Sequence, residues 1–145
     1  PKLSSQLIAL NGYGFAVFGL IWSTAAYAGM DGPGRTLVDL LDWPLNGDPT
    51  LPSDEARWLS AIGAGLCLGL GLMFARIVAP LIAMNDVVVS QIARKGSLLA
   101  LVVWLISDSA GSIVSGVPSN AVFNFIFFML LAVPLYLVKI DGQRT

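Results

Sequence analysis

The stretch VVWLISDSAGS, residues 102–112, decides how the rest of this chain is interpreted, because it places one carboxylate inside a long apolar run. The run is long enough to lie within a lipid bilayer, and Asp108 is the only acidic residue deep inside any long apolar segment of the chain. An ionisable side chain at the centre of a membrane helix costs about 2.5–3.5 kcal/mol on insertion scales, so we expect a partner or a function to offset that cost.

The composition indicates a membrane protein. Of the 145 residues, 56% are hydrophobic and 12% are charged, whereas a soluble domain has about 25% charged residues. The mean hydropathy is +0.78. The net charge of −1 provides no electrostatic attraction for nucleic acid. We therefore expect the lipid bilayer as a partner and no nucleic acid.

Four apolar segments are each long enough to cross a bilayer, which takes about 20 helical residues. They cover roughly residues 7–29, 56–78, 96–117 and 121–138. No internal repeat or long linker divides them. The predicted fold is an all-α integral membrane protein, with residues 1–145 forming one domain of four transmembrane helices in an antiparallel bundle. Ser119 or Asn120 is expected to cap the fourth helix.

The connection between the first two segments contains a short amphipathic pattern. Apolar residues at 37–41 are interrupted by Asp39 and followed by Asp42, and Trp43 precedes Pro44. We expect a short interfacial helix in this first outer loop, with Trp43 at headgroup level and Pro44 stopping the helix. The alternative is an irregular strand whose leucines fill gaps between the helices. A second short interfacial helix is expected within residues 81–95.

Small residues are spaced to share a helix face in two segments. The strips are Gly12, Ala16 and Gly19 in the first segment, and Ala61, Gly65 and Gly69 in the second. Such strips let helices approach closely in a membrane, where close packing rather than a hydrophobic force holds them together. The second strip could pack within the bundle or against another subunit, and we expect it to pack within the bundle. Ser53, followed by two carboxylates, is expected to cap the start of the second segment.

Basic residues are distributed unevenly between the two ends of the expected bundle. Lys2, Arg76, Arg94, Lys95, Lys139 and Arg144 belong to the side that holds both chain ends, and Arg35 and Arg57 belong to the opposite side. By the positive-inside rule, both termini are expected in the cytoplasm, with the acidic loop and the turn before Pro118 outside.

Asp108 is the leading candidate for a functional residue. It shares a helix face with Ser112, and Arg57 and Asn124 are expected in the same outer half of the membrane. One interpretation is a polar clamp, in which Asp108 pairs with Arg57 or accepts hydrogen bonds between helices. The other is a contact for a ligand or a proton. The clamp is the leading interpretation, because a proton path normally contains a chain of ionisable groups.

Several kinds of chemistry are disfavoured by the residues present. Histidine is absent and Cys67 is the single cysteine, so no His/Cys metal cluster or histidine-ligated haem is expected. The serines around Asp108 lack a histidine base for nucleophilic catalysis. The glycines between 63 and 71 lie in an apolar span and do not form a phosphate loop. No catalytic residue, metal or cofactor is predicted, although a bound lipid is compatible with the composition.

Segments two to four resemble a family of small four-helix bacterial membrane proteins of unknown function, the DUF4345 group. The resemblance lies in EAR at 55–57, GAGL at 63–66, GLG at 69–71 and GVPS at 116–119, about two thirds of the chain. It implies a four-helix fold and a bacterial inner-membrane location. Members often carry an arginine in the third helix and an acidic residue in the fourth. Here Asp108 is in the third segment, and the fourth has no charge before Lys139, so the resemblance implies no shared binding role.

Two functions follow from these observations. The first is a non-catalytic accessory, assembly or scaffold subunit of a larger membrane complex, for example a respiratory or photosynthetic one. Its basis is the small size, the glycine and phenylalanine faces and the lack of catalytic residues. The alternative is binding or transport of a lipid, quinone or other apolar small molecule in a pocket near Asp108. A membrane enzyme is the least favoured possibility.

Overall fold

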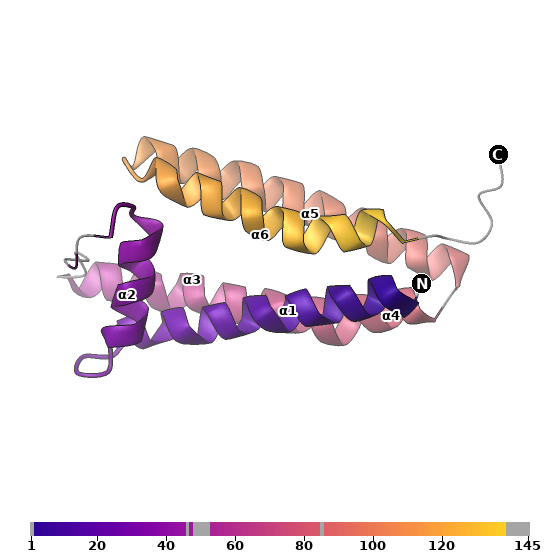
Figure 1. Ribbon diagram of the computed structural model, residues 1–145, viewed down its shortest axis with the longest axis horizontal. Coiled ribbons are helices and arrows are strands. Elements are labelled where there is room, and N and C mark those ends of the chain that lie inside the picture. The colour runs from indigo at the N-terminus through magenta and orange to yellow at the C-terminus, as the bar shows by residue number, and fades with distance from the viewer. Residues whose placement is uncertain (1, 46, 48–52, 85, 139–145) are drawn as a thin grey trace.

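The computed structural model describes residues 2–45, 47, 53–84 and 86–138 of the chain, and all regular elements within these ranges are helices (Figure 1). Four of the helices in the described ranges are long and apolar enough to span a membrane: Leu3–Ala26, Asp54–Ala83, Val87–Val114 and Pro118–Tyr136. The predicted all-helical class with four segments of membrane length is confirmed.

The elements in chain order are α1 (Lys2–Ser23), the 3-10 turn η1 (Thr24–Ala26), α2 (Gly32–Leu41), α3 (Asp54–Met73), the π-helical turn η2 (Phe74–Val78), α4 (Ala79–Ala83), α5 (Val87–Val114) and α6 (Pro118–Tyr136). The expected cap at Ser53 is confirmed, since its hydroxyl accepts a hydrogen bond from the Ala56 N–H at 3.2 Å.

The prediction of a second short interfacial helix within residues 81–95 is wrong, because most of this range belongs to α5. The carboxylate of Asp86 accepts a hydrogen bond from the Val89 N–H at 2.8 Å and caps α5, so the third long helix begins at Val87 rather than near residue 96. The second segment also runs past its expected end near residue 78, because the chain passes through η2 and continues through Pro80 as α4. A π-helical turn widens the backbone spacing just before the proline, whose ring would clash with a regular α-helical turn.

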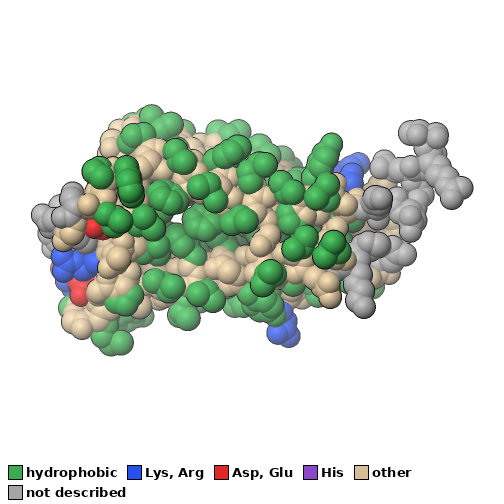
Figure 2. All heavy atoms as spheres, viewed as in Figure 1, with side chains coloured by type: hydrophobic (Ala, Val, Ile, Leu, Met, Phe, Trp, Pro, Cys, Tyr) green, Lys and Arg blue, Asp and Glu red, His purple; other side chains and the backbone are tan. Residues whose placement is uncertain are grey.

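The long helices form two pairs, α1 with α3 and α5 with α6, and the pairs contact each other through α1 and α6. Figure 1 shows that the pairs lie close together at the end where the N-terminus lies and diverge toward α2. The α5–α6 turn contains Gly116, whose φ of +85° suits glycine. Hydrophobic side chains cover the long helices on the face drawn in Figure 2, with the acidic side chains described there confined to the α2 end.

The first strip of small residues forms the contact between α1 and α3. A Cβ atom added at Gly12 would lie 2.8 Å from the Ala75 nitrogen, and one added at Gly19 would lie 2.6 Å from the Leu68 nitrogen. From the opposite side, a Cβ atom at Gly71 would collide with the backbone of Ala16. The two backbones are therefore nearly in contact, as expected for this strip.

The second strip does not pack within the chain, which corrects the prediction. Ala61, Gly65 and Gly69 are exposed, and a Cβ atom at either glycine would meet nothing within 4 Å. The face of α3 that packs on α1 instead carries Ala64 and Gly71. Ala64 and Gly71 are seven residues apart, about two turns, and so share one face, whereas Gly65 is rotated about 100° from Ala64 and belongs to another face.

A side chain on α1 compensates for a proline in α6. Pro134 has no N–H to donate to the carbonyl of Leu130, four residues earlier. The side-chain amide of Asn11 donates a hydrogen bond to that carbonyl. The helix pairs are therefore joined at a backbone group that α6 cannot satisfy by itself.

We expect Gly71→Ala to lower the free energy of unfolding by about 1–3 kcal/mol, because its methyl group meets the α1 backbone. Gly65→Ala, a matched change on the same helix, meets open space and should leave it unchanged or raise it by up to about 1 kcal/mol, since alanine favours a helix more than glycine does. Unfolding in detergent micelles followed by circular dichroism measures both. Equal effects would contradict the close α1–α3 contact.

We expect Asn11→Ala to cost about 1–3 kcal/mol of unfolding free energy, because it leaves the Leu130 carbonyl without a donor. In a Pro134→Ala background the new N–H at 134 can serve that carbonyl, so the loss should shrink. The four proteins of this double-mutant cycle should give a coupling of about 1 kcal/mol. Simple additivity would show that the Asn11 amide does not compensate for Pro134.

Candidate functional site

A cleft of about 610 Å³ opens between the two helix pairs where they diverge toward α2. Every long helix contributes to its lining, and α2 does as well: Trp22 comes from α1, Leu41 from α2, Ser60 from α3, Asp108 and Ser112 from α5, and Asn120 from α6. The residue that the sequence singles out therefore lies in the wall of a cleft, between elements that are distant in the chain.

Asp108 is half-buried on the cleft side of α5. The expected span ran to residue 117, but α5 ends at Val114. Asp108 therefore lies about 9 Å along the axis from the end of its helix, closer than the roughly 14 Å that the expected span implies. This position lowers the cost of placing a carboxylate in a membrane helix, since that cost falls away from the bilayer centre.

Asp108, Ser112 and Asn120 form a polar cluster. The Ser112 hydroxyl donates to the backbone carbonyl of Asp108 at 2.8 Å and lies 3.3 Å from Oδ1 of the same residue. Nδ2 of Asn120 donates to the Ser112 hydroxyl at 2.8 Å and lies 3.4 Å from Asp108 Oδ1. Within the described part of the chain, Oδ2 of Asp108 accepts no hydrogen bond. A carboxylate has about four acceptor positions, so much of this capacity stays unused.

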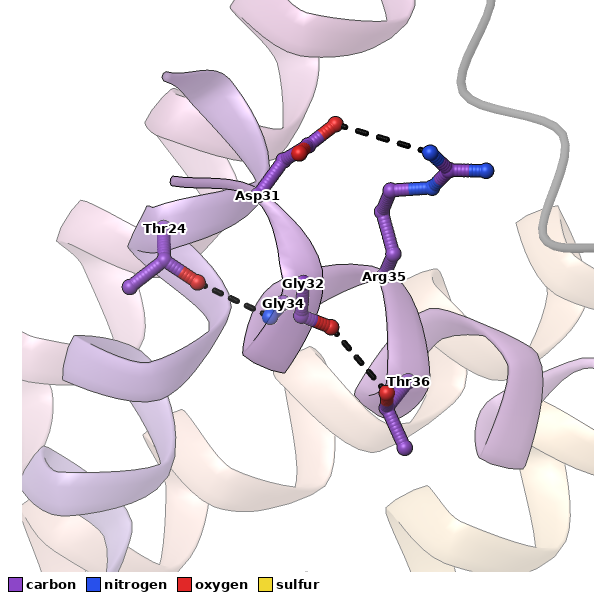
Figure 3. Close-up of polar contacts among 6 residues, drawn as sticks. All are labelled: Thr24, Asp31, Gly32, Gly34, Arg35 and Thr36. Atoms are coloured by element: carbon purple, nitrogen blue, oxygen red, sulfur yellow. Dashed lines mark hydrogen bonds and ion pairs between the residues drawn. The ribbon is translucent and has the colours of Figure 1, made fainter. Parts of the chain in front are cut away.

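The structure does not bring Arg57 to Asp108, so the ion pair that was one form of the expected polar clamp is not found among the described residues, whereas Asn120 of α6 supplies the other form, a hydrogen bond between helices. Among the described residues the two form no ion pair within 4 Å; the ion pair found there joins Arg35 to Asp31 at 3.8 Å (Figure 3). Arg57 is half-buried in the first turn of α3. Because the helix pairs diverge at this end, the backbones of α3 and α5 do not approach each other within the described ranges.

Asn120, not Asn124, is the α6 amide that contacts Asp108. Asn124 is buried, but its Nδ2 has no hydrogen-bond partner among the described residues. The sequence predicted Asn120 only as a possible helix cap, so its contact with Asp108 and Ser112 of α5 was not predicted. The N-cap position is instead Val117, with Pro118 beginning the helix, and the adjacent Ser119 hydroxyl donates to the Leu41 carbonyl at 2.6 Å.

The short helix expected in the first outer loop is confirmed as α2, which ends before Pro44. Figure 3 shows its first turn against η1, where the Gly34 N–H donates to the Thr24 hydroxyl at 2.8 Å. Ser119 holds its last turn to α6. Of its apolar residues, Val38 and Leu41 line the cleft. The helix is therefore fixed to both pairs and forms part of the cleft wall.

An aromatic cluster lies beside the cleft. The rings of Phe18 and Phe127 are 4.7 Å apart, and those of Phe15 and Trp104 are 6.0 Å apart, joining α1, α6 and α5. Trp22 continues the cluster from Phe18 into the cleft wall. Its indole Nε1 is buried with no hydrogen-bond partner in the described residues, and an unsatisfied donor of this kind costs about 1–3 kcal/mol.

An apolar pocket of about 200 Å³ lies further along the same helices. It is lined by Leu66 and Leu70 of α3, by Phe74 at the start of η2, and by Ala100, Leu101 and Trp104 of α5. Trp104 is one helical turn from Asp108. The space between α3 and α5 is therefore polar near Asp108 and apolar toward the N-terminal end of α5.

Comparisons of the chain with known protein families, with curated proteins and with solved structures found no match. The resemblance to the DUF4345 group therefore stays a prediction. Within the described ranges, no group of three or more His, Cys, Asp or Glu side chains is placed to hold a metal ion.

We expect Ser112→Ala to lower the free energy of unfolding by about 0.5–1.5 kcal/mol, because it removes the acceptor of the Asn120 amide. Ser109→Ala on the same helix should be neutral or stabilising, since the buried Ser109 hydroxyl has no described partner. Unfolding in micelles compares the two variants. A larger loss for Ser109→Ala would contradict the polar cluster.

Proposed function

We propose that this chain is an integral membrane protein whose four long helices cross the bilayer as an antiparallel bundle. The basic residues near both chain ends support cytoplasmic termini, and with them a cleft that faces the outer side. By its resemblance to the DUF4345 group, the membrane is a bacterial inner membrane. In this orientation Trp43, which is exposed beyond α2, lies at the outer headgroup level.

The function that this geometry supports best is binding of a lipid or another amphiphilic small molecule in the cleft. The observation that carries it is the unused carboxylate oxygen of Asp108 in the wall of a cleft of about 610 Å³. Small-molecule sites typically measure about 300–1,000 Å³ and combine apolar walls with a few polar groups. This cleft has both, and a separate apolar pocket lies beyond Trp104.

Binding without chemical turnover is the favoured activity. The Ser112 hydroxyl directs its hydrogen to a helix carbonyl at 2.8 Å rather than to the Asp108 carboxylate 3.3 Å away, and the Ser109 hydroxyl has no described hydrogen-bond partner. Asp108 can act both as a polar clamp between helices and as a contact for a ligand in this arrangement. One carboxylate oxygen faces Ser112 and Asn120, while the other is left for a ligand.

A substitution that fills the cleft tests this function. Gly111 lines the cleft, and a Cβ atom there meets nothing within 4 Å. We expect Gly111→Leu to abolish the lipid adducts seen by native mass spectrometry after extraction in mild detergent. Gly65→Leu adds the same side chain on an exposed face of α3 outside the cleft and should keep them. Loss of adducts in both variants, or in neither, would contradict binding in the cleft.

A second function is favoured by the exposed strip of Ala61, Gly65 and Gly69. We propose that this strip contacts other membrane subunits, so that the chain serves as an accessory, assembly or scaffold subunit of a larger complex, respiratory or photosynthetic for example. Small residues permit the close helix approach that drives association in lipid. Gly65→Leu should then release the chain from its complex on native gels, whereas Gly111→Leu should not. A monomeric wild-type chain at native expression would contradict this proposal.

A further inference from the structure

The charges that line the cleft all have the same sign. Asp42, at the end of α2, and Asp108, on α5, both contribute to the lining, and no Lys or Arg does so among the described residues. An anionic group in this space would face two carboxylates without a compensating cation. A cationic group would supply the opposite charge that an intramembrane carboxylate ordinarily has.

The polar cluster presents acceptors to the cleft rather than donors. The Ser112 hydroxyl has one hydrogen and directs it to the backbone carbonyl of Asp108. The Asn120 amide donates to Ser112 and approaches Asp108 Oδ1. Oδ2 of Asp108, with no described partner, is left to accept a hydrogen bond. A ligand group that contacts Asp108 therefore donates a hydrogen bond, and a charged donor forms the stronger bond to a carboxylate.

The rest of the lining matches the body of such a ligand. The ring of Trp22 forms part of the cleft wall, and an indole face attracts a cation through its π electrons. A hydrocarbon chain attached to the cation would lie against the apolar residues that line the cleft itself, among them Val38, Leu41 and Leu59.

We propose that the cleft binds an amphiphile with a cationic amine head, in which the ammonium group pairs with Asp108 and the hydrocarbon chain lies against the apolar residues of the cleft lining. The inference rests on the proposed binding function and specifies its ligand class. A free lipophilic amine and an amine-headed lipid share this chemistry.

Three probes of equal chain length test the head group: dodecylamine, dodecanol and dodecanoate. Titration into the full-length protein in maltoside micelles, followed by calorimetry and thermal stability, gives their dissociation constants. Dodecylamine should bind about tenfold or more tightly than either other probe, the change that one charge-assisted hydrogen bond produces. Phosphatidylethanolamine added to the same micelles distinguishes an amine-headed lipid from a free lipophilic amine. Binding of this lipid that depends on Asp108 supports an amine-headed lipid. Binding of dodecylamine but not of the lipid supports a free amine.

Substitutions locate the effect. Asp108→Asn keeps the size of the side chain and should reduce dodecylamine binding to the level of dodecanol. Asp54→Asn, in the exposed first turn of α3 and outside the cleft lining, should leave it unchanged. Gly111→Leu should block all three probes. If Asp108→Asn fails to fold, the Gly111→Leu variant and the wild-type preference among the probes still test the proposal.

The outcomes separate this inference from the function on which it rests. Equal binding of the three probes, blocked by Gly111→Leu, would overturn the cationic ligand and keep binding in the cleft. Preference for dodecanoate would overturn the inference in the same way. Binding that neither Gly111→Leu nor Asp108→Asn alters would overturn both.

Discussion

The close contact between the backbones of α1 and α3 is the constraint on which the rest of the structure depends. Gly12 and Gly19 on one helix and Gly71 on the other leave no room for a Cβ atom, so this pair lies side by side along its length. The α5–α6 pair has no comparable contact with α3 in the described ranges and is joined to the first pair through α1. The two pairs can therefore diverge toward α2, and the cleft follows from that divergence.

Polar groups in this helical protein join elements as well as line a site. Asn11 satisfies the carbonyl that Pro134 leaves free, and Ser119 holds α2 to α6. In the polar cluster, Asn120 joins α6 to α5 through Ser112. The donors of Ser112 and Asn120 in this cluster are used within the protein, and Oδ2 of Asp108 has no described partner. A structural contact between helices and an acceptor for a ligand are thus two properties of the same residues.

Much of the fold was predictable because its signals are local. Apolar segments of membrane length, the Ser53 cap and the short helix before Pro44 each depend on neighbouring residues alone. The boundaries near Pro80 and Asp86 were not predicted. A π-helical turn accommodates the proline, and the Asp86 cap starts α5 early. The site was predicted in part, since Asp108 and Ser112 lie in the cleft while Arg57 and Asn124 do not contact Asp108.

The sequence by itself determined the class of the protein, its four long apolar helices and the presence of one carboxylate among them, because composition and segment length are properties of the chain alone. Only the tertiary structure decided which small residues pack, since the rotation of α3 about its axis depends on its partner helix. It also decided that Asn120 takes the place expected for Arg57 beside Asp108. The short turn at Gly116 brings α6 against α5, whereas the divergence of the helix pairs separates α3 from α5.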